Sequence, residues 1–291
     1  MRNITLGNIS SAANDSFAGL PDARRRELMQ QLVKHLHAFA RETRLTHGEW
    51  QAAMAFLHRA GDISSSTRSE FGLLSDVLGL SSLVDLLASP ADQPGAAPAT
   101  PGSVLGPFHA AGSPWKPNPV DLTPGNAGEQ VLIRGRVLGA DGQALPEATL
   151  DFWQNAANGL YWQMDASQPP DNLRCQLRVA ADGGFAIRTI RPQPYQIPTD
   201  GPVWHDVVGP AGRTAWRPAH VHLIVSAPGH RTLVTELFDA ADPWLDRDAV
   251  FGVRDSLIVP YTAHGPGTAP DGRAMDKTFH TAQYDFALAP A

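Results

Sequence analysis

The sequence predicts an α+β protein in which an N-terminal helical domain is followed by an antiparallel β-sandwich domain. Residues 20–89 repeat apolar side chains at helical spacing, whereas residues 104–291 alternate in short runs separated by turns. The Pro/Gly/Ala-rich stretch "SPADQPGAAPATPGS" lies between these two regions. We therefore expect a helical domain with its linker over residues 1–103 and a β-sandwich domain over residues 104–291.

The N-terminal region contains three helical stretches. In "DARRRELMQQLVKHLHAFARE", helical spacing relates Leu28, Leu32, Leu36 and Phe39. "THGEWQAAMAFLHRA" opens with Thr46 three residues before Glu49, which is a capping-box pattern. "TRSEFGLLSDVLGLSSLVDLLAS" is more apolar and is interrupted by two glycines. Its wide apolar surface indicates contact on more than one side, including contact with a second subunit.

Short strands follow after residue 103. "EQVLIRGRVLGADGQALPEATLDFWQN" alternates like strands around the turn "GADGQ". "LRVAADGGFAIRTI" predicts a hairpin with "DGG" at its tip, and "HVHLIVSAPGHRTLVTELF" predicts a second hairpin that turns at "APGH". Short strands with frequent turns are typical of a sandwich or a barrel.

Composition narrows the class of protein. The chain has 291 residues, of which 43% are hydrophobic, so it can bury a large core. A net charge of -6 argues against general nucleic-acid binding. Cys175 is the single cysteine, which excludes an intrachain disulfide, and "MRNITLGNIS" lacks the features of a signal peptide. We expect a cytoplasmic protein with no nucleic-acid partner and no membrane anchor.

An H-x-H pair in "AWRPAHVHLIVSAPGH" is the first candidate for a site. Side chains alternate along a strand, so His220 and His222 share one face with Ile224. The opposite face reads as the core face and carries Ala219, Val221, Leu223 and Val225. Two adjacent imidazoles suit a metal ion, although such a pair also occurs as a structural feature.

Tyrosines are scarce in this chain, which has only Tyr161, Tyr195, Tyr261 and Tyr284. Tyr195 lies in "RPQPYQIPTDGP", where prolines restrict the backbone. A phenol has an ordinary pKa of about 10 and becomes a ligand only when a strong Lewis acid lowers that value, as ferric iron does. Two tyrosinates and two neutral imidazoles would hold Fe(III) and leave room for a substrate. Alternatively, the tyrosines serve packing, or the histidines and a carboxylate bind the zinc of a hydrolase.

The segment "WRPAHVH", preceded by "PYQIPTDGP" and followed by "VFGVRDSLIV", resembles the intradiol ring-cleavage dioxygenases. These are non-haem Fe(III) oxidoreductases that open catechols with dioxygen. The resemblance covers nearly the whole chain, including "GSVLGPF" and the helical region. It implies one Fe(III) per subunit with the ligands Tyr161, Tyr195, His220 and His222. It also implies that Tyr195 acts as a base toward the substrate and that Arg217 stabilises an electron-rich substrate carbon.

Within the family, the chain is most similar to members that open hydroxyquinol (benzene-1,2,4-triol) to 3-hydroxy-cis,cis-muconate, that is, maleylacetate. Asp76 lies among apolar residues in "LLSDVL", and the third hydroxyl of a triol would give it a partner, although a surface or intersegment role is an alternative. The substrate-binding positions of the family match Leu73, Asp76, Val104, Leu105, Gly106, Pro107, Phe108, Ile197, Pro198, Arg217 and Val250.

The chain also departs from the family pattern. Glu236 stands where relatives usually carry Gln or His, and we place it among the substrate-binding residues. The loop with Trp204 and His205 differs as well, which leaves cleavage of catechol or a substituted catechol to cis,cis-muconates as an alternative. A non-catalytic β-sandwich binding module is a more distant alternative. The resemblance further implies a homodimer formed through the N-terminal helices, with bound phospholipid.

Overall fold

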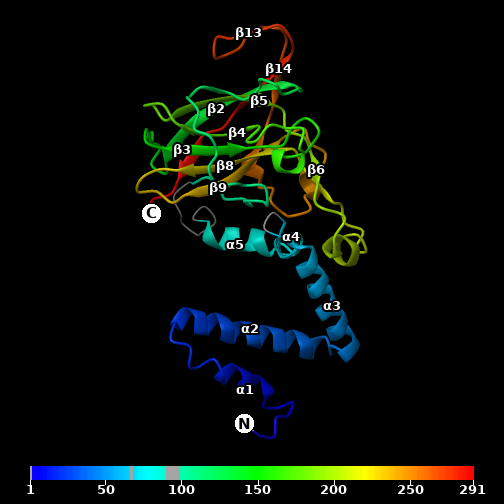
Figure 1. The fold of residues 1–291 in the computed structure, drawn as a ribbon. Helices are drawn as coiled ribbons and strands as arrows, with labels where there is room; N and C mark the ends of the chain where they lie inside the picture. Colours follow the sequence, from blue (N-terminus) through cyan, green and yellow to red (C-terminus); the bar gives the residue numbers. More distant parts are fainter. Residues whose placement is uncertain (1, 66–67, 90–98) are drawn as a thin grey trace. The chain divides into compact units, whose positions relative to one another are not determined.

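A computed structural model describes residues 2–65, 68–89 and 99–291 (Figure 1). Most of the predicted linker falls on residues 90–98, outside the described residues. Internal contacts divide the chain into two compact units, residues 1–62 and residues 63–291. This division differs from the expected domain boundary after residue 103, which stays a prediction.

The first unit consists of helices, with the bounds α1 (Ile9–Asp15), α2 (Ala23–Glu42) and α3 (His47–Ile63). Of these, α2 and α3 were predicted and α1 was not. The capping box is confirmed, because the Thr46 backbone N–H donates to Glu49 Oε2 at 2.8 Å and the Glu49 N–H donates to Thr46 Oγ1 at 3.3 Å. The apolar stripe of α2 is about half exposed along its length, with fractions of 50% to 56% at Leu28, Leu32, Leu36 and Phe39.

The second unit opens with two short helices, α4 (Glu70–Val77) and α5 (Leu80–Ala88). The sequence predicts one stretch here, but Gly79 adopts a left-handed φ of +73° and separates the two helices. Ser69 caps α4 by accepting a hydrogen bond from the Gly72 N–H at 3.0 Å. Among the described residues, no single helix is long and apolar enough to cross a membrane. Taken together, α4 and α5 are long and apolar enough, but a bend of 74° separates them.

Two β-sheets form the body of the second unit. One sheet has the order β1-β5-β2-β14-β11, with β15 also on β2. Its strands are β1 (Val120–Asp121), β2 (Gln130–Gly139), β5 (Gly184–Ile190), β11 (Thr262–His264), β14 (Phe279–Gln283) and β15 (Phe286–Leu288). The other sheet has the order β10-β9-β8-β3-β4. Its strands are β3 (Thr149–Trp153), β4 (Arg174–Arg178), β8 (His220–Ser226), β9 (Leu233–Asp239) and β10 (Ile258–Val259).

Shorter elements lie around these sheets. Two strand pairs are β6 (Tyr195–Gln196) with β7 (Trp216–Arg217), and β12 (Gly267–Thr268) with β13 (Ala274–Met275). The segment η3 (Val203–Val208) is a π-helix, and three 3₁₀ turns are η2 (Trp162–Met164), η4 (Leu245–Arg247) and η5 (Asp255–Leu257).

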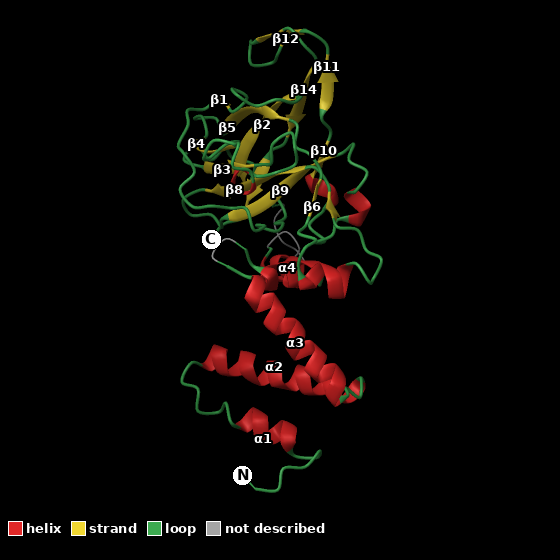
Figure 2. Cartoon of the chain, turned by 45° about the vertical axis from the view of Figure 1, so that its right-hand side comes forward, coloured by secondary structure: helices red, strands yellow, loops and turns green. Residues whose placement is uncertain are grey.

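The core lies between the two sheets, which form separate layers in Figure 2. Val131 and Ile133 of β2 contribute to it from one layer, and Leu150 and Phe152 of β3 contribute from the other. On β8 the predicted core face is confirmed, because Val221, Leu223 and Val225 belong to this core. The two histidines of β8 therefore point away from it.

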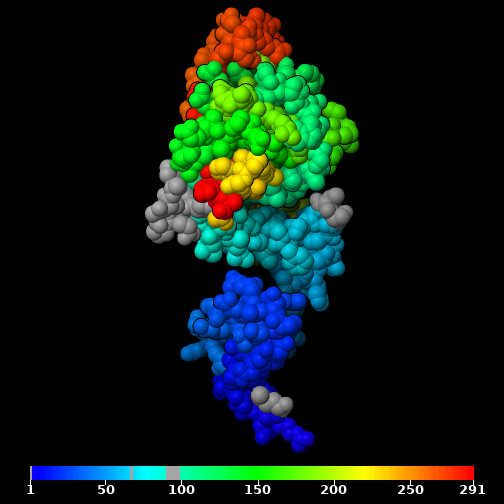
Figure 3. All heavy atoms as spheres, turned by 90° about the vertical axis from the view of Figure 1, so that its left-hand side faces the viewer, coloured from blue at the N-terminus to red at the C-terminus, as the bar shows by residue number. Residues whose placement is uncertain are grey.

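The α+β fold class is confirmed, with one difference in strand direction. β14 and β15 run parallel to β2, β1 runs parallel to β5, and β10 runs parallel to β9, so both sheets are mixed. Parallel neighbours need a long connection rather than a tight turn, and here the C-terminal segments return beside strands formed much earlier. The extreme C-terminus packs on the β8–β9 turn (Figure 3), where the Ala291 N–H donates to the Gly229 carbonyl at 3.0 Å.

The two predicted hairpins have different outcomes. β8 and β9 pair as predicted, with Val225 opposite Leu233 across the "APGH" turn. The "DGG" segment does form a turn, with Gly183 at φ +78°, but the flanking strands β4 and β5 belong to different sheets. The prediction of a paired hairpin there is wrong, because both strands find better partners within their own layers.

Gly135 of β2 lies against the backbone of the segment that connects β14 to β15. A Cβ atom at this position would lie 1.7 Å from the Tyr284 carbonyl oxygen, which is backbone and cannot rotate away. We expect Gly135→Ala to lower the free energy of unfolding by about 1–3 kcal/mol, measured by urea denaturation. Gly265→Ala is the matched control, because its Cβ would meet no atom within 4 Å. Equal stability of the two variants would contradict this packing.

Candidate metal centre

The site begins with a row of three side chains across the five-stranded sheet. His222 of β8 lies opposite Trp153 of β3 on one side and opposite Glu236 of β9 on the other. Residues directly opposite in antiparallel strands project from the same face. The Trp153 and His222 rings stack, with centroids 4.8 Å apart and planes at 3°. All three side chains are buried.

The two imidazoles converge through their Nε2 atoms, which lie 3.2 Å apart. His220 Nδ1 lies 2.6 Å from the Pro218 carbonyl and donates to it, which leaves Nε2 as the free nitrogen. Burial lowers the pKa of His220 and lowers that of His222 well below its ordinary value. Both rings are therefore neutral near pH 7, which is the form that binds a metal.

Tyr161 and Tyr195 complete the cluster. Their ring centroids are 5.6 Å apart, and Tyr195 lies 5.5 Å from the ring of His220. Among the side chains that the structure describes, none is a hydrogen-bond partner for the buried Tyr161 hydroxyl. Burial raises the pKa of Tyr195, and it raises the pKa of Tyr161 well above the ordinary value.

This donor set fits a highly charged metal ion. The two Nε2 atoms converge, and Tyr161, whose ring centroid lies 6.2 Å from that of His222, adds a buried hydroxyl without a partner. A cation held between these side chains would satisfy all three atoms. Glu236 adds a carboxylate, and one donor atom each from His220, His222 and Glu236 lie within 4.8 Å of one another. A phenol with a raised pKa becomes a ligand only for a strong Lewis acid, which favours a trivalent ion over zinc.

The loop "VLGPF" packs against His222 and Tyr161. Phe108 stacks on Tyr161 with ring centroids 4.4 Å apart. Gly106 has a φ of +69°, and a Cβ atom there would lie 3.2 Å from His222 Cε1, so the loop needs glycine at this point. Val104 is buried, whereas Leu105 and Pro107 are exposed. The structure thus brings this loop to the candidate metal centre.

Arg217 is buried beside the same cluster and lies opposite Tyr195 in the β6–β7 pair. Its Nη1 donates to Glu236 Oε1 at 2.8 Å, and its Nε donates to Asp248 Oδ1 at 3.0 Å. Burial opposes the charged form, but Asp248 and Glu236 outweigh it and raise the pKa of Arg217 well above its ordinary value. The guanidinium therefore remains a fixed cation.

The other predicted pocket positions range from partly to fully buried. Burial raises the pKa of Asp76, while a hydrogen bond from Ser81 and the charge of Arg217 oppose that rise. Ile197 and Val250 are buried. Leu73 and Pro198 are partly buried.

Sequence reasoning missed several residues of this cluster. Asp248, Ser103, Gly252 and Trp153 were not singled out, although each contacts Arg217, Glu236 or His222. Glu236 was singled out, but its position opposite His222 was not predicted. The register of the "APGH" hairpin could have given that position, because it sets which β9 residue faces His222. No comparable local signal identifies Ser103, which is distant in sequence from its partner.

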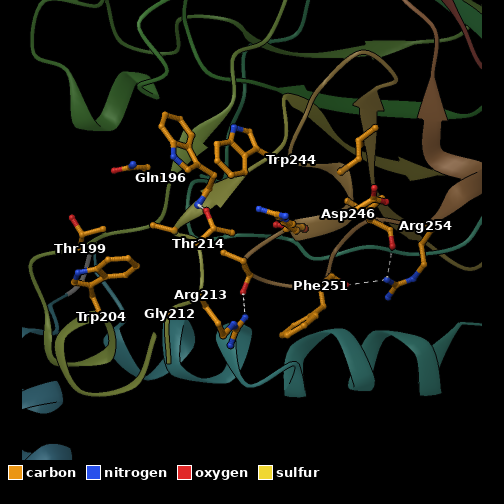
Figure 4. A pocket seen from close by; sticks show the side chains of 17 residues that line it. Gln196, Thr199, Trp204, Gly212, Arg213, Thr214, Trp244, Asp246, Phe251 and Arg254 are labelled. Atoms are coloured by element: carbon orange, nitrogen blue, oxygen red, sulfur yellow. Dashed lines mark hydrogen bonds between the residues drawn. The ribbon is translucent and has the colours of Figure 1, made fainter. Parts of the chain in front are cut away.

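One cavity is lined by none of the tyrosines or histidines of the candidate metal centre. It has a volume of about 1040 Å³, and Figure 4 shows residues that line it, including Gln196, Trp204 and Trp244. Trp216 lines it as well. Side chains alternate along a strand, so Gln196 points away from the side of Tyr195, and Trp216 points away from the side of Arg217. The cavity therefore lies on the side of this strand pair that is opposite the candidate metal centre. Asp248 is the residue shared by the cavity wall and the Arg217 cluster.

Comparison with known families defines the class of this protein. A family model described as dioxygenase matches residues 104–290, and one described as catechol dioxygenase N terminus matches residues 22–95. The chain therefore belongs to the intradiol dioxygenase family, as the sequence motifs predicted.

Individual relatives span the whole chain. Hydroxyquinol 1,2-dioxygenase from Nocardioides simplex is 40% identical over 279 residues, which cover 95% of this chain and 92% of that protein. 6-Chlorohydroxyquinol 1,2-dioxygenase from Cupriavidus pinatubonensis is 40% identical over 290 residues, which cover 100% of this chain and 99% of that protein. The crystal structure of hydroxyquinol 1,2-dioxygenase from Pseudomonas putida DLL-E4 is similar with a TM-score of 0.88 at 42% identity, covering 98% of this chain and 99% of that one.

The buried Arg217 cluster generates a stability prediction. Removing the guanidinium leaves Glu236 and Asp248 buried without their cation, so we expect Arg217→Ala to lower the free energy of unfolding by about 3–5 kcal/mol. Urea denaturation measures this loss. The exposed Arg247 provides the control, and Arg247→Ala should change stability by no more than about 0.5 kcal/mol. A loss below about 1 kcal/mol for Arg217→Ala would show that the cluster is not held as described.

Proposed function

We propose that this protein uses a non-haem Fe(III) ion, one per subunit, to cleave hydroxyquinol with dioxygen between its two adjacent hydroxylated carbons. The product is 3-hydroxy-cis,cis-muconate, that is, maleylacetate. The observation that carries this proposal is the convergence of two histidines and two tyrosines beside a buried arginine. Relatives of about 40% identity along the whole chain, named for hydroxyquinol and 6-chlorohydroxyquinol, support the choice of substrate.

Four residues would hold the iron: Tyr161, Tyr195, His220 and His222. When bound, Fe(III) supplies Lewis acidity that makes phenols acidic and withdraws electron density from the diol ring, which then reacts with dioxygen. The neutral imidazoles are ready to bind because burial disfavours their protonated forms. Trp153 and Phe108 stack on the ligand side chains and limit the access of water to them.

Tyr195 is the residue we assign as the base. Burial raises the pKa of its phenol, so Tyr195 Oη, once ionised, readily accepts a proton from a diol hydroxyl. Tyr161 lies deeper, at 1% exposure, and keeps its place. Arg217 holds a positive charge beside His220, with 3.3 Å between Nη1 and Nε2, and stabilises negative charge that develops on a substrate carbon.

Asp76 is the residue we assign to the third hydroxyl of the substrate. Its side chain is partly buried on α4, and the charges of Arg217, Glu236 and Asp248 act on it. A hydroxyl that donates to this carboxylate would distinguish a triol from catechol, because a site built for a hydrogen bond discriminates against a ligand that lacks it. The remaining assigned pocket positions are Leu73, Val104, Leu105, Gly106, Pro107, Phe108, Ile197, Pro198, Glu236 and Val250.

The half-exposed apolar stripe of α2 supports a further part of the proposal, a homodimer formed through the N-terminal helices. A bound phospholipid, also proposed, would cover apolar surface of the same kind.

Oxygen uptake with hydroxyquinol and catechol supplied in parallel tests the substrate. We expect kcat/KM for hydroxyquinol to exceed that for catechol by at least about 10-fold, since one hydrogen bond to a charged group contributes about 1.5–3 kcal/mol. Product is followed by its absorbance and identified by mass spectrometry. Equal or faster turnover of catechol would retain ring cleavage and reject the assignment of Asp76.

Two variants separate metal binding from proton transfer. His222→Ala removes a ligand, so the iron content per chain, measured by mass spectrometry of the metal, should fall at least about 10-fold. Tyr195→Phe keeps three ligands but loses the base, so it should retain part of the iron while kcat falls about 10²–10⁴-fold. A His222→Ala protein with full iron content would show that the ligand assignment is wrong.

A further inference from the structure

Among the residues that the structure describes, Glu236 is the carboxylate paired with both histidines. It is fully buried, and its Oε1 lies 2.8 Å from Arg217 Nη1, 3.3 Å from His220 Nε2 and 3.5 Å from His222 Nδ1. Its Oε2 lies 3.2 Å from Arg217 Nη2 and accepts from Ser103 Oγ at 2.6 Å. One side chain thus joins the guanidinium, the imidazoles and the segment that leads into "VLGPF".

Within the described ranges, the acceptor placed near His222 Nδ1 is Glu236. When an imidazole binds a metal through Nε2, its Nδ1 carries a proton and donates to a second group. For His220 that group is the Pro218 carbonyl. In the described part of the chain, His222 Nδ1 is buried and has no hydrogen-bond partner, and Glu236 is the carboxylate paired with it at 3.5 Å. A shift of a few tenths of an ångström would make this a hydrogen bond.

Arg217 is held from two directions. Glu236 accepts hydrogen bonds from its Nη1 and Nη2. Asp248 accepts from its Nε at 3.0 Å and from its Nη2 at 3.3 Å. Two carboxylates leave the guanidinium little freedom to rotate away from His220. The fit around this pair is tight, because a Cβ atom on Gly252 would lie 2.8 Å from Arg217 Nη2 and 2.9 Å from Glu236 Oε2.

We infer that Glu236 is a positioning residue of the metal centre. Its Oε1 accepts from His222 Nδ1, which directs Nε2 toward the iron, and the same carboxylate fixes Arg217 beside the substrate. This inference rests on the proposed iron site and assigns a role to the residue by which the chain departs from the family pattern. If Glu236 instead binds the iron directly, Glu236→Gln should lose iron as fully as His222→Ala does.

The test compares Glu236→Gln and Glu236→Ala in the full-length, iron-loaded protein. Glutamine keeps an acceptor oxygen and the shape of the side chain but removes the charge, so Glu236→Gln should retain iron within about 2-fold of wild type. Its tyrosinate-to-iron absorption band should move to longer wavelength, because loss of a nearby anion makes the iron a better electron acceptor. We expect kcat to fall about 10-fold, with KM changed less than about 2-fold, since Arg217 loses one anchor.

Glu236→Ala removes both the acceptor and the anchor. We expect its iron affinity, measured by competition with a chelator, to fall about 10–100-fold. Asp239→Asn is the matched control: Asp239 is buried on the same strand and accepts from Arg191 Nε at 2.6 Å, but it does not contact the histidines. It should lose thermal stability while keeping wild-type iron affinity and the wild-type absorption band.

Four results would overturn the inference. Glu236→Gln that loses iron as fully as His222→Ala would mean that the carboxylate is itself a ligand. Asp239→Asn that loses iron as much as Glu236→Ala would attribute the effect to general destabilisation. Iron-loaded wild type with both Glu236 variants unchanged would remove the positioning role alone, whereas wild type with neither iron nor the absorption band would reject the proposed function as well.

Discussion

The contact on which the site depends is the buried ion pair network of Arg217 with Glu236 and Asp248. A guanidinium removed from water is tolerated only when its donors are matched by acceptors, and here two carboxylates provide that match. The three residues belong to β7, to β9 and to the turn that follows η4. The network therefore sets the positions of three segments that are separate in the sequence, and it places a permanent positive charge next to His220.

The order of the sheet explains the geometry around this network. β8 lies between β3 and β9, so His222 has Trp153 on one side and Glu236 on the other. The opposite face of β8 is anchored in the apolar core, which prevents a shift in register that would turn the histidines inward. Core packing on one face thus stabilises the polar cluster of the candidate metal centre on the other face.

Several parts of the fold were predictable from local patterns. Helical spacing and the Thr46 capping box identified α2 and α3, and turn residues identified the β8–β9 hairpin. Patterns of this kind failed where a partner comes from a distant segment. The "DGG" turn joins strands in different sheets, and β14 adds to β2 in parallel, because strand partners are chosen by packing across the whole layer and not by the nearest turn.

By itself, the sequence determined which side chains could meet a metal. The two-residue spacing of His220 and His222 puts both on one face of a strand, and the prolines around Tyr195 restrict its loop, since both effects act within a few residues. Only the tertiary structure decided what surrounds them. Glu236 faces His222 because of strand register, and Ser103 reaches Glu236 across 133 residues of chain. The Ser103 contact depends on how distant segments of the chain pack together, and no local rule of spacing encodes it.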